Sequence, residues 1–383
     1  MLEVSGSHLA YLRPLGEEMV SFKQSKTISA CLWSIVFISF SYIVRFGLEA
    51  TVKVGVRDIS RRTGFSPATV SNALNHKRGV SKKTAEAIIK AAQELGYQRP
   101  NKLEKIVFIV ARKSGRVLDE SDFHPIVING VEREARCHGL STNYVTVDLL
   151  DPESGPLLHE MCQDPTNGIV LLGTEMEEGD YAPFYGSAAP LVIVDGWCIR
   201  DFIESIVISN ESSAYRAVRY LIDRGHTRIG YLRGDLQIRN FPLRKRGYLL
   251  ALREAGLEFD RRYEVTVGTT ISTAYEASRK WVAANHELPT AFFAENDVMA
   301  CGMMRALLEA GYRVPQDVSF VGFDDLPLAT AMLPALTTLH VPKHDIGEIA
   351  VRKLIEQVRD PHDYVCTTHI SARFVERDSV AQI

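Results

Sequence analysis

From residue 106 onward, short aliphatic runs alternate with amphipathic helical stretches such as 127–138 and 212–224. This alternation is typical of parallel sheets with helices on both faces. Because about 280 residues exceed what one such sheet usually holds, we expect an α/β domain with two lobes. The predicted buried strands are IVFIVA (106–111), TNYVTV (142–147), GIVLLG (168–173), LVIVD (191–195), SIVIS (205–209), RIGYLRG (228–234), AFFAEND (291–297) and VSFVGFDD (318–325).

Residues 52–103, ahead of this domain, have the periodicity of three short helices instead of strands. The first helix should end at Gly64, because glycine tolerates a left-handed turn. Ser66 is placed to cap the second helix, with Pro67 at its first position, where a missing N–H costs nothing. Ser81 is placed to cap the third. A helix, a tight turn and a second capped helix predict a helix-turn-helix motif.

The same segment is strongly basic, whereas the rest of the chain is not. Residues 52–103 carry 11 Lys and Arg against 3 Asp and Glu, a net charge of +8. Residues 104–383 carry 29 against 40, a net charge of −11, and the first 51 residues balance at 4 against 4. A helix pair of this shape also occurs as a plain packing unit, and a basic face can simply be solvated. The two features together favour an anionic partner, double-stranded DNA.

The start of the second helix would supply most of the DNA contacts. Asn72 can pair with adenine through two hydrogen bonds, while Pro67 and Ala68 can contact a thymine methyl group. Hydroxyl groups and free N–H groups at a helix start can hold phosphates, and nearby cations add non-specific attraction. The predicted DNA-binding residues are Arg57, Ser66, Pro67, Ala68, Thr69, Ser71, Asn72, Asn75, Lys77 and Arg78.

These residues resemble the headpiece of the lactose/galactose-repressor (LacI/GalR) family of bacterial transcription regulators. The resemblance rests on VGVRDISRRTGFSPATVSNALNHKRGVSKKTAEAIIKAAQELGYQRPN and continues through GHTRIGYLRG, RKRGYLLALREAGL, AFFAENDVMACGMMRALLEAGYRVPQDVSFVGFDDLPLATAMLPALTTL and SARFVERDS. It thus covers nearly everything from about Thr51 onward.

The resemblance implies a helix-turn-helix headpiece, residues 52–103, followed by a two-lobed domain similar to periplasmic sugar-binding proteins, residues 104–383. It implies a homodimer that binds a pseudo-palindromic operator, usually as a repressor, since two-fold protein symmetry matches a two-fold site. A small ligand, such as a sugar or a sugar derivative, would control operator affinity allosterically. Whether the ligand induces or co-represses stays open.

Two departures from the family pattern concern DNA recognition. Asn72 stands where many members carry Arg, so the operator preference cannot be transferred. The family usually has a hinge of about two helical turns, with a Leu that wedges into the minor groove. Here Asn101 is followed only by KLEK before Ile106, and Leu103 comes too early for that role. We therefore expect a short, non-helical hinge and weaker DNA bending.

The ligand of a two-lobed α/β domain binds between the lobes, near the carboxyl ends of the strands. Carboxylates and amides there suit a polyhydroxylated ligand. The predicted effector-binding residues are Arg244, Asn296, Asp324, Asp195, Trp197 and Phe241, of which Arg244 corresponds by resemblance to the family's ligand-contacting arginine. Asp297 and Asp325 are as well placed to cap helices, Arg244 could form a surface ion pair, and the aromatic residues could be packing. His124 is near the cleft by position, though a lone histidine is more often structural.

Residues 27–44, TISACLWSIVFISFSYIV, carry no charge and just reach the length of a membrane span. Three interpretations compete for this part of the N-terminal extension, residues 1–51: a membrane anchor, a buried or disordered appendage, or an upstream stretch included by a misplaced start. We favour the last. A cleaved signal fits poorly, because no small-residue site follows and the next residues are the basic segment.

Other functional classes fit the sequence less well. It contains no P-loop, no HExxH, no GxSxG and no strand-linked GxGxxG, so we expect no enzyme and no cofactor. The six cysteines lie far apart with no metal-binding spacing, which predicts reduced thiols, no structural zinc and a cytoplasmic location. An exported solute-binding protein anchored by 27–44 would have no reason to carry the basic helix-turn-helix.

Overall fold

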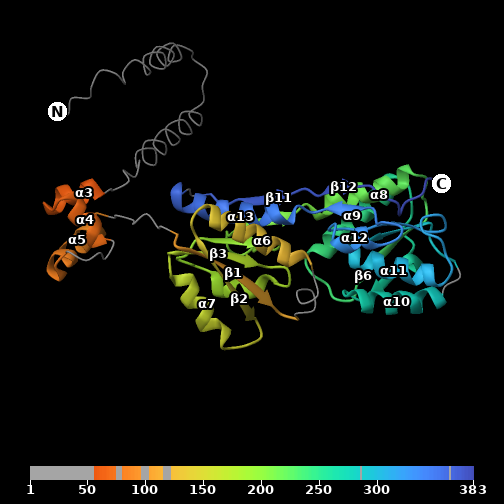
Figure 1. Cartoon of the computed structure of the whole chain (residues 1–383), viewed down its shortest axis with the longest axis horizontal. Coiled ribbons are helices and arrows are strands. Elements are labelled where there is room, and N and C mark those ends of the chain that lie inside the picture. Colours follow the sequence, from red (N-terminus) through yellow and green to blue (C-terminus); the bar gives the residue numbers. More distant parts are fainter. Residues whose placement is uncertain (1–55, 75–79, 96–102, 115–121, 285–286, 362–363) are drawn as a thin grey trace, which may run out of the picture. The chain divides into compact units, whose positions relative to one another are not determined.

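The computed structural model describes residues 56–74, 80–95, 103–114, 122–284, 287–361 and 364–383. The chain divides into two compact units, residues 1–99 and 100–383 (Figure 1). The apolar segment 27–44 lies outside the described residues. Within the described ranges, no helix is both long enough and apolar enough to cross a membrane.

The first unit contains the three predicted helices, α3 (Val56–Thr63), α4 (Pro67–Leu74) and α5 (Lys82–Glu94). Each contributes an apolar residue to one small core, and its most buried members are Ile59, Val70, Ala73, Ile88 and Ala92. The turn between α3 and α4 passes through Gly64 at φ +74°, the left-handed conformation expected there.

The second unit has two lobes, and lobe I is built on a six-stranded parallel sheet with strand order β11-β5-β4-β3-β1-β2. Its strands are β1 (Lys105–Arg112), β2 (Ser141–Asp148), β3 (Asn167–Leu172), β4 (Leu191–Val194), β5 (Glu204–Ile208) and β11 (Thr367–Ile370). Its helices are α6 (Phe123–Cys137), α7 (Ser154–Gln163), η1 (Glu178–Phe184) and α13 (Lys343–Arg359).

Alternate residues of β1 serve opposite faces of this sheet. Ile106 and Phe108 pack in the core beneath α6 and α13, whereas Val107 and Ile109 pack with residues of α7 and η1. Both faces are therefore buried, which explains why the strand is a continuous apolar run.

Lobe II is built on a four-stranded parallel sheet with order β7-β6-β8-β9. Tyr231 and Phe293 belong to the core shared with α8 and α9, while Leu232 and Phe292 pack with α10 and α11 on the other face. Its elements are α8 (Asn210–Asp223), β6 (Ile229–Gly234), α9 (Asn240–Glu254), η2 (Arg261–Tyr263), β7 (Glu264–Val267), α10 (Ile271–Ala284), β8 (Ala291–Ala294), α11 (Asp297–Glu309), β9 (Ser319–Val321) and α12 (Pro327–Ala331).

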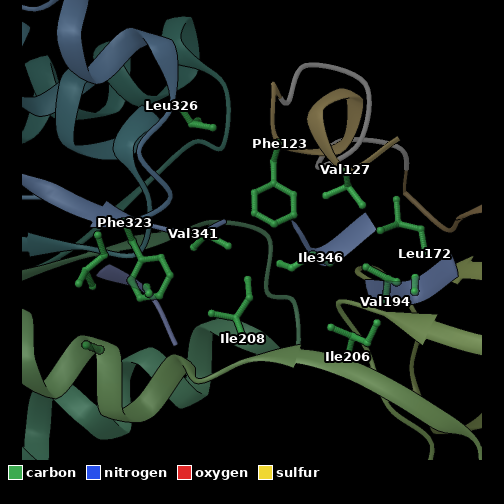
Figure 2. Packing of buried hydrophobic residues seen from close by; sticks show 14 of the residues in the cluster. Phe123, Val127, Leu172, Val194, Ile206, Ile208, Phe323, Leu326, Val341 and Ile346 are labelled. Carbon is green, nitrogen blue, oxygen red and sulfur yellow. The ribbon is translucent and has the colours of Figure 1, made fainter. Parts of the chain in front are cut away.

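The chain passes between the lobes at three places: from β5 to α8, from β10 (Thr338–His340) to α13, and from β11 to β12 (Arg373–Val375), which pairs antiparallel with β10. The apolar core is continuous across these passages. Figure 2 shows Ile208 and Val341 lying between Phe323 of lobe II and the lobe I residues Val194 and Ile206. The lobes are thus joined by packed side chains as well as by backbone.

Two helix pairs cross closely at glycine. A Cβ atom at Gly130 of α6 would collide with the backbone carbonyl of His344 in α13, and one at Gly347 of α13 would collide with that of Val127. Gly247 brings α9 equally close to the backbone of Glu211 in α8. Only a residue without a side chain permits these approaches.

All eight predicted strands are present, and the predicted two-lobed α/β fold after an all-α headpiece is confirmed. The short strands β7, β10, β11 and β12 were not predicted. Residues 96–102 lie outside the described residues, so the short non-helical hinge stays a prediction. Leu103 is buried in the core of lobe I, beside Ile106 and Leu354 around Gly168.

Candidate functional site

The start of α4 is a capped and exposed helix end. The Oγ of Ser66 accepts a hydrogen bond from the backbone N–H of Thr69 at 3.1 Å, and the two hydroxyl oxygens lie 2.9 Å apart. Each hydroxyl carries one proton, so their mutual bond uses one and leaves the other free to donate. Ser66, Pro67 and Ala68 are exposed. The first turn can therefore approach an anionic surface.

The other predicted DNA-binding residues are distributed around the same helices. Arg57 is exposed on α3. Thr69, Ser71 and Asn72 are half-buried on α4, whose Val70 faces the core. Asn75, Lys77 and Arg78 lie outside the described residues, and their role stays a prediction.

A small cavity of about 40 Å³ lies between lobes I and II. It lies at the carboxyl ends of strands, where Thr174 follows β3, Asp195 follows β4 and Asn296 follows β8. A cavity of this size holds a few water molecules, so a sugar enters only if the lobes separate. It is lined by Phe123, His124, Thr174, Asp195, Ile208, Ile238, Asn240, Phe241, Arg244, Asn296 and Asp324.

Five of the six predicted effector-binding residues line this cavity; Trp197 does not. Its indole ring instead stacks against the guanidinium group of Arg239, whose carbon lies 3.9 Å from the ring centroid. Arg239 also donates a hydrogen bond to the backbone carbonyl of Trp197. Phe241 is the predicted aromatic residue that reaches the cavity, and it is buried.

Arg244 is buried at 3 % exposure on the inner face of α9, so the alternative of a surface ion pair is wrong. Its Nε donates to Asn210 at 2.8 Å, and Nη2 lies 3.4 Å from Asp324. Nη1 donates to the backbone carbonyl of residue 295. The guanidinium plane also lies on the ring of Phe323, with 3.6 Å between its carbon and the ring centroid. A buried cation with this many partners is held in one orientation.

A continuous chain of buried hydrogen bonds connects this arginine with lobe I. The amide of Asn210 donates to Asn240 at 3.0 Å, and that of Asn240 donates to Asp195 at 2.8 Å. The other carboxylate oxygen of Asp195 accepts from Thr174 Oγ1 at 2.7 Å. Because Thr174 and Asp195 belong to lobe I, this series of hydrogen bonds couples the two lobes through polar contacts.

The three aspartates at strand ends have positive φ angles, a backbone conformation that residues other than glycine rarely adopt. Asp195, Asp324 and Asp325 have φ values of 58°, 103° and 56°, and they are the non-glycine residues of the described ranges with positive φ. Such backbone strain is concentrated at functional sites, because it aims a side chain where regular geometry would not.

Burial dominates the electrostatics of the cavity. It raises the pKa of Asp195 to about 6, against the opposing effects of the Thr174 hydrogen bond and the Arg244 charge. Burial likewise raises the pKa of Asp324 despite the nearby charges of Arg244 and Lys343. Burial lowers the pKa of His124 to about 4. The cavity therefore contains carboxylates that are costly to ionise and a histidine that stays neutral.

Asp297 and Asp325 have structural partners, but neither caps the helix that follows it, so the capping alternative is wrong: Asn296 caps α11, and α12 has no side-chain cap. Asp297 accepts hydrogen bonds from the backbone N–H of Leu326 at 2.7 Å and from the hydroxyl of Thr338. Asp325 pairs with Arg377 at 2.6 Å and lies 2.9 Å from His340. Asn296 is the N-cap of α11 and also lines the cavity.

Several residues of the site were missed from the sequence. Thr174 gave no signal beyond lying near the end of β3, and Asn240, at the start of α9, gave none. Glu295 gave one, since it is a charge directly after the apolar strand AFFA. It is 1 % exposed and accepts hydrogen bonds from Tyr231 Oη at 2.8 Å and from Gly234 N–H at 2.7 Å, while burial raises its pKa to about 7.

Known families and relatives match both units. Residues 56–101 match the family of bacterial regulatory proteins, lacI family, and residues 218–380 match the periplasmic binding protein-like domain. The ribose operon repressor of Escherichia coli (strain K12) is 32 % identical over 311 residues, which cover 80 % of this chain and 93 % of that protein. The HTH-type transcriptional repressor PurR of Vibrio vulnificus (strain CMCP6) is 29 % identical over 332 residues, covering 86 % and 99 %.

Solved structures share the fold. The lac repressor dimer bound to operator and an anti-inducer gives a TM-score of 0.63 at 23 % identity, covering 86 % of this chain and 99 % of that one. A complex of the transcriptional regulator CelR with cellobiose gives 0.62 at 24 % identity, covering 85 % and 100 %. The likeness extends over nearly the whole length of each relative, and the chain belongs to the LacI family of bacterial regulatory proteins.

Proposed function

We propose that this protein is a sequence-specific transcriptional repressor whose affinity for a pseudo-palindromic operator is set by a small effector bound between lobes I and II. The observation that carries the proposal is the pairing of an exposed, capped α4 in a basic headpiece with a polar cavity that joins two lobes. The names of the relatives, a ribose operon repressor and a PurR repressor, support it.

The protein acts as a homodimer in the cytoplasm, where its two headpieces meet the two halves of the operator. Each α4 lies in a major groove, with Asn72 directed to a base and the hydroxyl groups of Ser66 and Thr69 to phosphate. The effector changes the relation between lobes I and II, and with it the spacing of the headpieces. The cavity binds its ligand without catalysing a reaction.

Selection of operator sequences from a random duplex library by the purified full-length chain tests this proposal. We expect enrichment of a two-fold symmetric sequence. Its affinity should then change when a neutral sugar such as D-ribose or cellobiose is added. Enrichment of no sequence, with or without sugars, would contradict the proposed function.

A further inference from the structure

His124, the second residue of α6, is a buried polar side chain with an unmet hydrogen-bonding atom. It is 5 % exposed and lines the cavity between the lobes. Its Nε2 lies 3.3 Å from Thr174 Oγ1. Its Nδ1 is buried and has no hydrogen-bond partner among the described residues. A buried polar atom left in this state lowers stability unless a ligand or a water molecule satisfies it.

The neighbouring hydrogen bonds fix which nitrogen of His124 carries the proton. Thr174 Oγ1 donates its single proton to the Asp195 carboxylate, so it can only accept from Nε2 of His124. Nε2 is therefore protonated. Burial lowers the pKa of His124 to about 4, so the ring is neutral near pH 7. A neutral ring with the proton on Nε2 presents Nδ1 as a bare acceptor.

The cationic groups around the cavity are already engaged by protein atoms. All three nitrogen atoms of Arg244 donate to protein acceptors. The Nζ of Lys343 donates to the backbone carbonyls of residues 324, 325 and 341. The carboxylates of Asp195 and Asp324 line the cavity beside His124. The Arg244 bonds use three of its five N–H donors, so a ligand near His124 meets the bare Nδ1 and two carboxylates, while two N–H donors of Arg244 remain on its other side.

We propose that His124 is a specificity-determining residue of this cavity, whose Nδ1 accepts a hydrogen bond from a hydroxyl group of an uncharged, polyhydroxylated effector. A phosphate or carboxylate group at Nδ1 would face an acceptor and two carboxylates, and is disfavoured at that position relative to a hydroxyl group. The inference rests on the proposed function, since it names the ligand class that the same cavity accepts. Entry of such a ligand separates the lobes, because the present cavity of about 40 Å³ is too small for a sugar.

Matched pairs of neutral and anionic sugars test the ligand class. The full-length chain is titrated calorimetrically with D-ribose and ribose 5-phosphate, and with D-glucose and D-gluconate. We expect heat of binding from at least one neutral member and none from the anionic members. Binding of an anionic member alone would overturn the proposal, and so would binding of no member by a protein that still selects an operator. Failure to select any operator would instead overturn the proposed function.

Two substitutions test His124 itself. His124→Phe keeps a ring but removes Nδ1, and should weaken the best neutral sugar about tenfold or more, as expected when a buried ligand hydroxyl loses its acceptor. His124→Asn places an amide oxygen near the Nδ1 position and should retain most of the affinity. The deoxy analogue of that sugar lacking the critical hydroxyl should bind wild type and His124→Phe equally well.

The imidazole nitrogen signals of the protein labelled with ¹⁵N-histidine give an independent readout. We expect an unprotonated Nδ1 and a protonated Nε2 in His124 without ligand, and a shift of the Nδ1 signal when the neutral sugar is added. Equal affinities of wild type and His124→Phe for both the sugar and all its deoxy analogues would mean that a buried water satisfies Nδ1, and would overturn the proposal.

Discussion

Asn240, at the start of α9 in lobe II, donates a 2.8 Å hydrogen bond to the carboxylate of Asp195, at the end of β4 in lobe I. Both side chains are buried, and Asp195 also accepts from Thr174 within its own lobe. The bond therefore links the lobes across the cavity. Its strength depends on the ionised form of Asp195, because a carboxylate accepts stronger hydrogen bonds than a neutral acid.

Asn240→Ala should loosen this link. Asp195 would lose a buried donor, which costs roughly 1–3 kcal/mol of stability, and the lobes should separate more often. Urea denaturation measures the first effect and the small-angle scattering radius of gyration the second. Gln237→Ala is the matched control, because its amide donates only to Gly234 within lobe II. An unchanged radius for Asn240→Ala would show that the remaining contacts between the lobes, the apolar packing and the bond from Arg239 to Trp197, are sufficient to hold them together.

The Arg244 and Asp324 pair should behave as one unit. Arg244→Met leaves buried Asp324 without its hydrogen-bonded cation, with only the charge of Lys343 nearby, and should cost about 3–5 kcal/mol. The double variant Arg244→Met/Asp324→Asn should lose less than the sum of the single losses. Arg246, whose exposed pair with Glu211 is closer at 2.7 Å, is the control, and Arg246→Met should cost less than about 1 kcal/mol. Additive losses for the buried pair would contradict the coupling. Denaturant unfolding of wild type, Arg244→Met, Asp324→Asn and the double variant measures this double-mutant cycle.

The raised pKa of Glu295 predicts that the folded protein loses stability as the pH rises. Its folded pKa is raised to about 7, so the folded state binds more protons than the unfolded state between the ordinary value of 4.5 and about 7. Stability is therefore greatest below that window and falls as pH rises through it, by about 3 kcal/mol for this one group. Glu295→Gln cannot ionise and should show a smaller decline from pH 5 to pH 8, measured by urea midpoints. Asp297, with a pKa raised to about 8, should leave a residual slope in this variant.

Asn72→Ala should relax sequence preference at one base position of the operator, at a cost of roughly 1–3 kcal/mol. Mobility-shift assays on operators with single base changes measure this. Lys83→Ala, on the exposed start of α5, should weaken all sequences about equally, since a lysine there attracts phosphate without reading bases. Uniform weakening by Asn72→Ala would instead assign Asn72 to the phosphate backbone.

Gly130→Ala should destabilise the effector domain by about 1–3 kcal/mol or more, because its methyl group collides with the backbone carbonyl of His344 in α13. Gly155 of α7 is the control, since nothing lies within 4 Å of a Cβ atom built there. Gly155→Ala should raise stability by about 0.5–1 kcal/mol through helix propensity. Thermal unfolding of both variants distinguishes the two effects.

The sequence predicted those parts of the fold that local patterns determine. Continuous apolar runs located most of the eight predicted strands, because strands buried on both faces must be apolar throughout. The partly exposed β2 was located by alternation of apolar and polar residues instead. The caps at Ser66 and Ser81 located the starts of α4 and α5 to the residue, because the hydroxyl of each accepts from a backbone N–H three positions later. The strands β10 and β12, three residues each, form where distant segments meet, which no local pattern records.

The cavity was predicted only in part for the same reason. Acidic residues and amides at strand ends pointed to Asp195, Asn296 and Asp324, since parallel strands bring their carboxyl ends together. Asn240 and Thr174 act through hydrogen bonds to partners 45 and 21 positions away, so their role depends on the fold. Trp197 follows the same strand end as Asp195, yet its ring stacks against the guanidinium group of Arg239 and does not line the cavity.

Both lobes are finished by the last stretch of chain, residues 343–383. Helix α13 covers β3 and β4, β11 supplies the edge partner of β5, and β12 pairs with β10. The Ser379 hydroxyl then joins the backbone of Thr337 to that of Phe320. During synthesis, lobe I therefore lacks its edge strand β11 and its covering helix α13 until these residues leave the ribosome, whereas the four-stranded sheet of lobe II is complete by Val321. A product truncated before residue 343 would expose the core of lobe I and would lack the β12 pairing and the Ser379 bridge of lobe II.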